Sequence, residues 1–75
     1  MTGIICAMQI EADGIIALSQ NTQTEEIAGM KFTTGTLNGK DIAVVVCGVG
    51  KVNAAMCAVV LIEKFNPDVV INSGV

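Results

Sequence analysis

Two short runs of uninterrupted apolar residues constrain the fold most strongly, Gly3–Met8 (G-I-I-C-A-M) and Ile42–Cys47 (I-A-V-V-V-C). Runs of this length and composition are typical of strands that are buried on both faces of a sheet. Each run precedes a segment in which apolar residues recur at helical spacing, Gln9 to about Gln20 and Lys51 to Phe65. The sequence therefore predicts an α/β sheet with helices packed on its faces.

The other segments complete a predicted order of β-α-β-β-α-β. Asn38-Gly39 is a strong signal for a two-residue hairpin turn, because both residues tolerate positive φ. Asn66-Pro67 is expected to end the second helix, since the residue before proline avoids the α region. The polar segment Asn21–Glu26 is predicted to be a loop. Beyond the first strand, we expect strands at Ile27–Leu37, Asp41–Cys47 and Asp68–Asn72.

The second predicted helix is apolar on two sides. One side carries Val52, Ala55, Met56, Val59 and Ile62, and the other carries Ala54, Cys57, Ala58, Leu61 and Phe65. Such a helix is expected to be buried on both sides. One side can pack on this sheet, so the other requires further protein or a partner subunit. With 52% hydrophobic and 15% charged residues, residues 1–75 are expected to be the N-terminal fragment of a single domain whose remainder is absent.

Charge and cysteine content exclude several classes of protein. The net charge is −3, and the basic residues are four lysines without any arginine. Nucleic acid and anionic membrane surfaces are therefore not expected partners. Three widely spaced cysteines without histidine do not form a metal-binding pattern, and they suggest buried thiols in a reducing compartment. We expect a soluble cytoplasmic protein that has no signal peptide, metal or cofactor.

Glu11 is the candidate catalytic residue. It follows the first predicted strand, at the sheet edge where open α/β sheets bind their ligands. Its helical neighbours Ile15 and Leu18 suggest drier surroundings than those of Asp13. A carboxylate placed there can act as a general base, or it can simply complement the dipole of its own helix.

Two glycine-containing segments are expected at the same edge of the sheet. Gly48-Val49-Gly50-Lys51 joins a strand to a helix, but Asn53 occupies the place of the third glycine in a dinucleotide-binding motif. The segment is either a ligand-binding turn or an ordinary tight turn. Asn72-Ser73-Gly74 ends the last strand and leaves the same two alternatives open. Together with Glu11, these segments favour a small-molecule site.

The ordered combination of motifs resembles the nucleoside phosphorylase/nucleosidase superfamily, and in particular its 5′-methylthioadenosine/S-adenosylhomocysteine nucleosidase branch. The resemblance spans the whole chain. It is carried by Gly3–Glu11 (G-I-I-C-A-M-Q-I-E), Phe32–Gly39 (F-T-T-G-T-L-N-G), Cys47–Ala55 (C-G-V-G-K-V-N-A-A) and Pro67–Val75 (P-D-V-V-I-N-S-G-V). It implies the N-terminal part of a phosphorylase/hydrolase-like three-layer sandwich with a mixed central sheet.

The resemblance also implies a reaction and four site residues. Members of this branch hydrolyse the bond between adenine and a 5′-thio-substituted ribose, and dimers are the rule. Glu11 matches the glutamate that activates the attacking water and holds a ribose hydroxyl. Met8 and Val49 match residues that line the ribose and 5′-thio end of the pocket, and Val75 matches a position beside the purine. The acid that protonates adenine lies in the later portion of the family and is absent here.

Other functions remain open at this point. A phosphorylase of the same superfamily would use phosphate in place of water, although a chain without arginine favours hydrolysis. The chain could also be a binding module that holds a nucleoside without cleaving it, or a truncated fragment with no function of its own.

Overall fold

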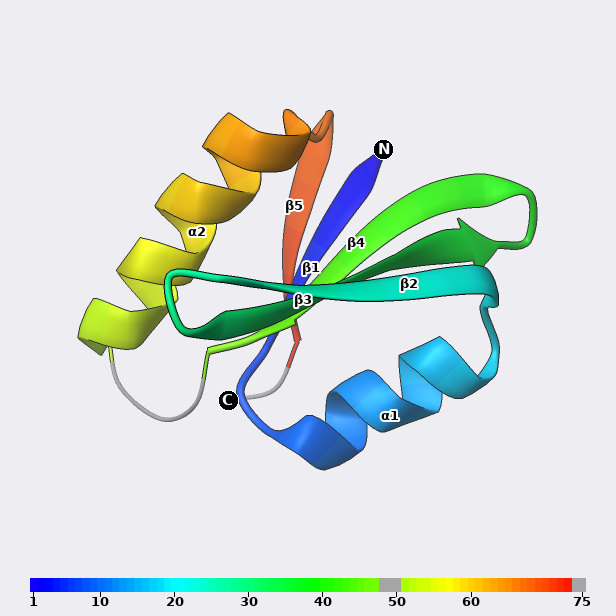
Figure 1. The fold of residues 1–75 in the computed structure, drawn as a ribbon, viewed down its shortest axis with the longest axis horizontal. Helices are drawn as coiled ribbons and strands as arrows, with labels where there is room; N and C mark the ends of the chain where they lie inside the picture. The colour runs from blue at the N-terminus through cyan, green and yellow to red at the C-terminus, as the bar shows by residue number, and fades with distance from the viewer. Residues whose placement is uncertain (48–50, 74–75) are drawn as a thin grey trace.

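A computed structural model describes residues 1–47 and 51–73, of which residues 51–54 are described by their backbone alone. The elements, labelled in Figure 1, are β1 (Thr2–Cys6), α1 (Gln9–Ala17), β2 (Gln20–Ile27), β3 (Met30–Leu37), β4 (Lys40–Val46), α2 (Lys51–Phe65) and β5 (Val69–Ser73). Among the described residues, no helix has the length and apolar character needed to cross a membrane.

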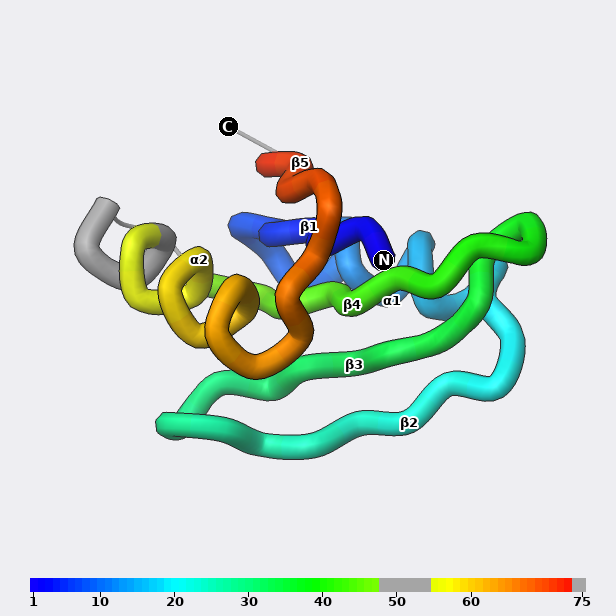
Figure 2. Tube along the Cα trace, turned by 90° about the horizontal axis from the view of Figure 1, so that it is seen from above, coloured from blue at the N-terminus to red at the C-terminus, as the bar shows by residue number. Residues whose placement is uncertain are grey.

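The five strands form one mixed sheet in the order β2-β3-β4-β1-β5, which can be followed from bottom to top in Figure 2. β1 is parallel to both of its neighbours, β4 and β5. β2, β3 and β4 form an antiparallel meander. A mixed central sheet was the expectation from the sequence, and it is confirmed.

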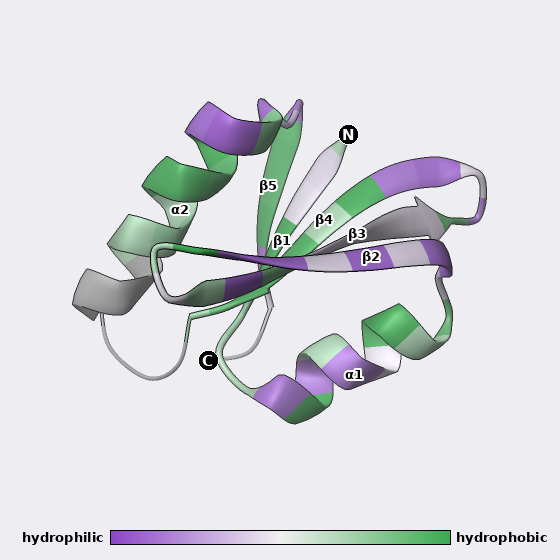
Figure 3. Ribbon diagram, viewed as in Figure 1, coloured by the Kyte–Doolittle hydropathy of each residue, from purple (hydrophilic) through white to green (hydrophobic). Residues whose placement is uncertain are grey.

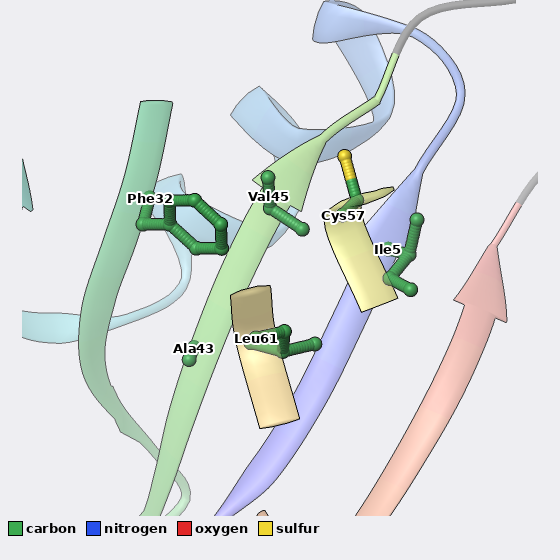
Figure 4. Close-up of a cluster of buried hydrophobic side chains, with 6 residues drawn as sticks. All are labelled: Ile5, Phe32, Ala43, Val45, Cys57 and Leu61. Carbon is green, nitrogen blue, oxygen red and sulfur yellow. The ribbon is translucent and has the colours of Figure 1, made fainter. Parts of the chain in front are cut away.

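The two helices cover opposite faces of the sheet. α2 packs on Ile5, Phe32, Ala43 and Val45 through its own Cys57 and Leu61, as drawn in Figure 4. α1 packs through Ala12 on the other face, where Ile4, Cys6, Ile42 and Val44 are buried. The alternation of neighbouring residues between these two clusters follows from the period of two in a β-strand. The expected three-layer α/β/α arrangement is therefore present.

Gly3 allows α2 to pack closely on β1. A Cβ atom added at Gly3 would lie 2.7 Å from Cδ2 of Leu61, a distance that requires the leucine to move. Leu61 is fully buried and belongs to the core cluster on the α2 face of the sheet. A side chain at position 3 would therefore require the Leu61 side chain to repack.

Three expectations for the first half of the chain differ from the structure. Residues 21–26 are not a loop but belong to β2, and the expected strand Ile27–Leu37 is divided by a turn at Ala28-Gly29. β2 escaped prediction because it is an edge strand in which every side chain except Ile27 is exposed, so its sequence carries no apolar alternation. The first helix ends at Ala17, earlier than Gln20.

The second helix ends where Asn66-Pro67 predicted. Asn66 adopts a left-handed φ of 48°, and its N–H donates a hydrogen bond to the carbonyl oxygen of Ile62 at 2.9 Å. This is the usual closure of a helix by a residue that tolerates positive φ, and the following proline cannot continue the helix.

The two hairpin turns of the meander differ in one residue, and this difference predicts a stabilising substitution. Ala28-Gly29 has φ values of 54° and 79°, and Asn38-Gly39 has 53° and 80°. Alanine is strained in this left-handed region, whereas asparagine tolerates it. We expect Ala28→Asn to raise the free energy of unfolding of the full-length protein by about 0.5–1 kcal/mol.

Urea unfolding at one fixed protein concentration measures this effect. Asn38→Ala is the matched control and should lower the urea midpoint by a comparable amount. An Ala28→Asn variant with an unchanged or lower midpoint would show that the strain at Ala28 is negligible.

Candidate active site

The carboxyl ends of three parallel strands meet at one edge of the sheet. The backbone N–H of Cys47, just after β4, donates to the carbonyl oxygen of Cys6 at 2.9 Å. On the other side of β1, the N–H of Ala7 donates to the carbonyl oxygen of Ser73 at 3.4 Å. We expected the loops that follow these three strands to come together at one edge of the sheet. The three strands do end at the same edge, and the structure describes the chain there up to Cys47 and up to Ser73. Ligands of open α/β sheets bind at this edge.

Glu11 stands in the first turn of α1, directly beyond this edge. Its backbone N–H donates to the carbonyl oxygen of Met8 at 3.2 Å, and its Oε1 accepts the N–H of Met8 at 3.1 Å. The carboxylate thus caps its own helix, which is one of the two roles that the sequence left open. An ionised carboxylate accepts about four hydrogen bonds, so this contact leaves capacity for a ligand or a water molecule.

The surroundings of Glu11 differ from those of Asp13, as expected. Glu11 is half-buried, whereas Asp13 is exposed and accepts a hydrogen bond from Nε2 of Gln9 at 2.8 Å. Leu18 does not contribute to the drier environment, because its side chain is 74% exposed. Ile15, the other helical neighbour named from the sequence, is partly buried against the cluster on the α1 face.

Cys6 is the titratable group beside Glu11 at the end of β1. Burial, then the nearby Glu11 carboxylate and then Cys47 raise the pKa of the Cys6 thiol above its ordinary value. The thiol is consequently neutral at neutral pH. Glu11 is thus a carboxylate held by backbone contacts next to a neutral, buried group. Such a carboxylate can take a proton from water or stabilise positive charge that develops on a bound substrate.

Met8 is an exposed apolar side chain at the same edge. It precedes α1 with extended backbone dihedrals, and 58% of its surface is exposed. An exposed methionine beside a half-buried carboxylate is a suitable contact for an apolar substituent of a ligand. The other two expected site residues, Val49 and Val75, lie outside the described residues, as do Gly48, Gly50 and Gly74.

Sequence reasoning treated the three cysteines only as small buried apolar residues and missed their positions. Cys6 ends β1, and Cys47 follows β4 at the same edge. The available signal was their place in the two uninterrupted apolar runs, Cys6 within Gly3–Met8 and Cys47 at the end of Ile42–Cys47. In residues 1–47 and 51–73, no group of three or more histidine, cysteine, aspartate or glutamate side chains is arranged to hold a metal ion.

Comparison with known proteins assigns the chain to a family. Residues 2–75 match the model of the phosphorylase superfamily. The chain therefore belongs to the phosphorylase superfamily. Within it, the chain is 49% identical over 72 residues to the 5′-methylthioadenosine/S-adenosylhomocysteine nucleosidase of Shewanella loihica, which covers 96% of this chain and 31% of that protein.

Solved structures give the same assignment. The nucleosidase of Colwellia psychrerythraea in complex with adenine superimposes with a TM-score of 0.92 at 38% identity, covering 95% of this chain and 29% of that one. The Neisseria meningitidis nucleosidase in complex with methylthio-immucillin-A gives a TM-score of 0.93 at 32% identity, covering 97% and 32%. The chain thus spans about a third of the length of the relatives it matches.

Proposed function

We propose that the full-length protein hydrolyses the N-glycosidic bond of 5′-methylthioadenosine and S-adenosylhomocysteine, releasing adenine and a 5′-thio-ribose. The observation that carries this proposal is the half-buried Glu11 carboxylate at the carboxyl edge of β1, in a chain whose relatives are named for this reaction. The methylthioribose product retains the sulfur of methionine, so the reaction suits methionine salvage. We place it in the cytoplasm, in keeping with three cysteines that form no disulfide.

Glu11 has two tasks in this proposal. Breaking the bond between ribose and adenine develops positive charge on the ribose, and a neighbouring carboxylate stabilises that charge. The same carboxylate removes a proton from the attacking water as the water bonds to the ribose carbon. Protonation of the leaving adenine is assigned to an acid in the remainder of the protein.

Met8, Val49 and Val75 are proposed to shape the substrate pocket. Met8 would contact the ribose and the 5′-thio substituent, and its exposed apolar side chain supports this role. Val49 would join it there, and Val75 would lie beside the purine.

The assay that tests the function follows adenine release by purified full-length protein from both thio-nucleosides. Absence of turnover with tight nucleoside binding would favour a binding module instead.

We further propose that the full-length protein is a homodimer. The outer side of α2 carries Met56, Val59 and Ile62, which are 50%, 56% and 51% exposed, and a shallow apolar hollow there is lined by Ala55, Met56, Val59 and Val60. Figure 3 shows this apolar character along α2. An apolar helix face of this kind is typical of an interface.

Sedimentation of the full-length protein at micromolar concentration measures the oligomeric state. We expect a dimer, and Val59→Glu should shift it toward the monomer, because a buried unpaired carboxylate opposes association. Lys64→Glu, at the end of the same helix, is the control for a charge change alone. A wild-type monomer would contradict the proposal.

A further inference from the structure

Three sulfur-containing side chains meet beneath α2: one from α2 itself, one from β3 and one from the residue that follows β4. Cys57, in the middle of α2, is fully buried, and its Sγ donates a hydrogen bond to Sδ of Met30 at 3.2 Å. Met30 begins β3. The Cys57 side chain also forms a hydrogen bond with Cys47. Figure 4 shows the sulfur of Cys57 pointing toward the end of the sheet where β4 finishes.

Cys47 is the more accessible of these two thiols. It follows β4 directly, is half-buried, and packs against the buried cluster to which Cys57 belongs. Its backbone is fixed by the hydrogen bond from its N–H to the carbonyl oxygen of Cys6 at 2.9 Å. In the described part of the chain, Cys47 is therefore the thiol that a dissolved oxidant reaches first, and Cys57 lies buried next to it.

Cys6 is not positioned to compete for Cys57. The Cys6 side chain belongs to the cluster on the α1 face of the sheet, whereas Cys57 lies on the α2 face. Alternation along a strand places successive side chains on opposite faces, and a disulfide requires its two Cβ atoms to be close. Cys47 also packs against the α2-face cluster, so its side chain lies on the opposite face from that of Cys6 although the two residues are neighbours across the sheet. The geometry thus favours the pair of Cys47 and Cys57.

The buried thiols are also poor first targets for an oxidant. Burial, then the charge of Cys47 and its hydrogen bond raise the pKa of Cys57 to about 11, and burial with the Glu11 carboxylate raises that of Cys6. Both are neutral thiols at neutral pH, and the thiolate is the reactive form. Cys57 is therefore suited to react second, with a sulfur that has already been activated.

We propose that Cys47 and Cys57 form an oxidation site in which hydrogen peroxide joins the two sulfurs in a reversible disulfide. In the first step, Sγ of Cys47 takes one oxygen from peroxide, giving a sulfenic acid and one water molecule. In the second step, Sγ of Cys57 attacks the Cys47 sulfur, and the hydroxyl leaves as water with the proton of Cys57. Two thiols are oxidised by two electrons, and one peroxide is reduced to two water molecules.

A peptide map of the full-length protein tests this site directly. Trypsin cuts after Lys40, Lys51 and Lys64, so Cys47 lies in peptide 41–51 and Cys57 lies in peptide 52–64. After brief treatment with hydrogen peroxide and blocking of remaining thiols, the two peptides should appear joined, with two hydrogen atoms fewer than their sum. Dithiothreitol should separate them again.

Three outcomes of this map would overturn the proposal. They are a disulfide that includes Cys6, irreversible oxygen addition to Cys47 without a link to Cys57, and oxygen addition confined to Met30. The map of the wild-type protein decides among them without any variant, so a folding defect cannot obscure the result.

Two variants sharpen the assignment. Cys6→Ala should form the link between peptides 41–51 and 52–64 to the same extent as the wild type, within about twofold, since Cys6 lies on the other face. Cys57→Ala should lose the link entirely and convert Cys47 to the irreversible oxygenated form. Loss of the link in Cys6→Ala that retains native circular dichroism would contradict the proposed pairing.

Discussion

Replacing Glu11 by glutamine in the full-length protein is expected to lower the rate of adenine release from 5′-methylthioadenosine by about 10²–10⁴-fold, the usual contribution of a general acid or base. Glutamine cannot accept a proton from water and cannot balance positive charge on the ribose. Its side-chain oxygen can still accept the N–H of Met8, the contact that Glu11 makes at 3.1 Å. The loss should therefore be one of turnover and not of folding.

Asp13→Asn is the matched control for this substitution. Asp13 is an exposed carboxylate on the same helix and is hydrogen-bonded to Gln9. The turnover of the Asp13→Asn variant should stay within about threefold of wild type. Thermal melts of both variants should coincide with that of the wild type. If Glu11→Gln retains turnover within about threefold of wild type, Glu11 only caps its helix.

A polypeptide of residues 1–75 alone is expected to show no adenine release and no cooperative monomeric unfolding. It supplies one proposed catalytic carboxylate but no acid for the adenine, and catalytic groups that act as a unit fail together. It also exposes apolar side chains that soluble monomers rarely leave uncovered. These are Met56, Val59 and Ile62 on α2 and Val69, Val70 and Ile71 on the edge strand β5.

Three measurements test this expectation. Circular dichroism melts and the binding of a hydrophobic dye report on folding, and an adenine-release assay reports on activity. The full-length protein under identical conditions is the control and should melt cooperatively, bind little dye and turn over substrate. A 75-residue polypeptide that melts cooperatively as a monomer and releases adenine would refute both parts of the prediction.

The parts of the fold that are buried were predictable from the sequence. β4 and α2 were expected close to their observed bounds, because an uninterrupted apolar run and a helix apolar on two sides leave few alternatives. β2 was not predictable in this way, since an exposed edge strand has no apolar periodicity. The turn at Ala28-Gly29 was also missed, because alanine seldom occupies the left-handed region.

The candidate site was predictable in position but not in its contacts. The end of the first apolar run placed Glu11 at the carboxyl edge of the sheet. Glu11 is more buried than Asp13, as expected, but of the two helical neighbours named for this, Leu18 is exposed and only Ile15 is partly buried. That Glu11 caps its own helix through Met8, and that it lies beside Cys6, depends on the exact end of β1. The roles of Met8, Val49 and Val75 remain predictions.

The grouping of Cys47, Cys57 and Met30 could not be inferred from spacing. It depends on the position of α2 along β4 and on the residue at which β3 begins after the hairpin turn. Packing of the whole core sets both. The close contact between Gly3 and Leu61 fixes part of that packing. Side-chain neighbours of this kind follow from tertiary structure and not from local sequence pattern.

The most direct test of the proposed hydrolysis is the rate of adenine release from 5′-methylthioadenosine by the full-length protein in phosphate-free buffer. We expect full turnover without phosphate, no acceleration when phosphate is added, and free 5-methylthioribose as the sugar product, because the proposed role of Glu11 is to activate water. Turnover that requires phosphate and yields the sugar 1-phosphate would contradict the account and identify a phosphorylase of the same superfamily.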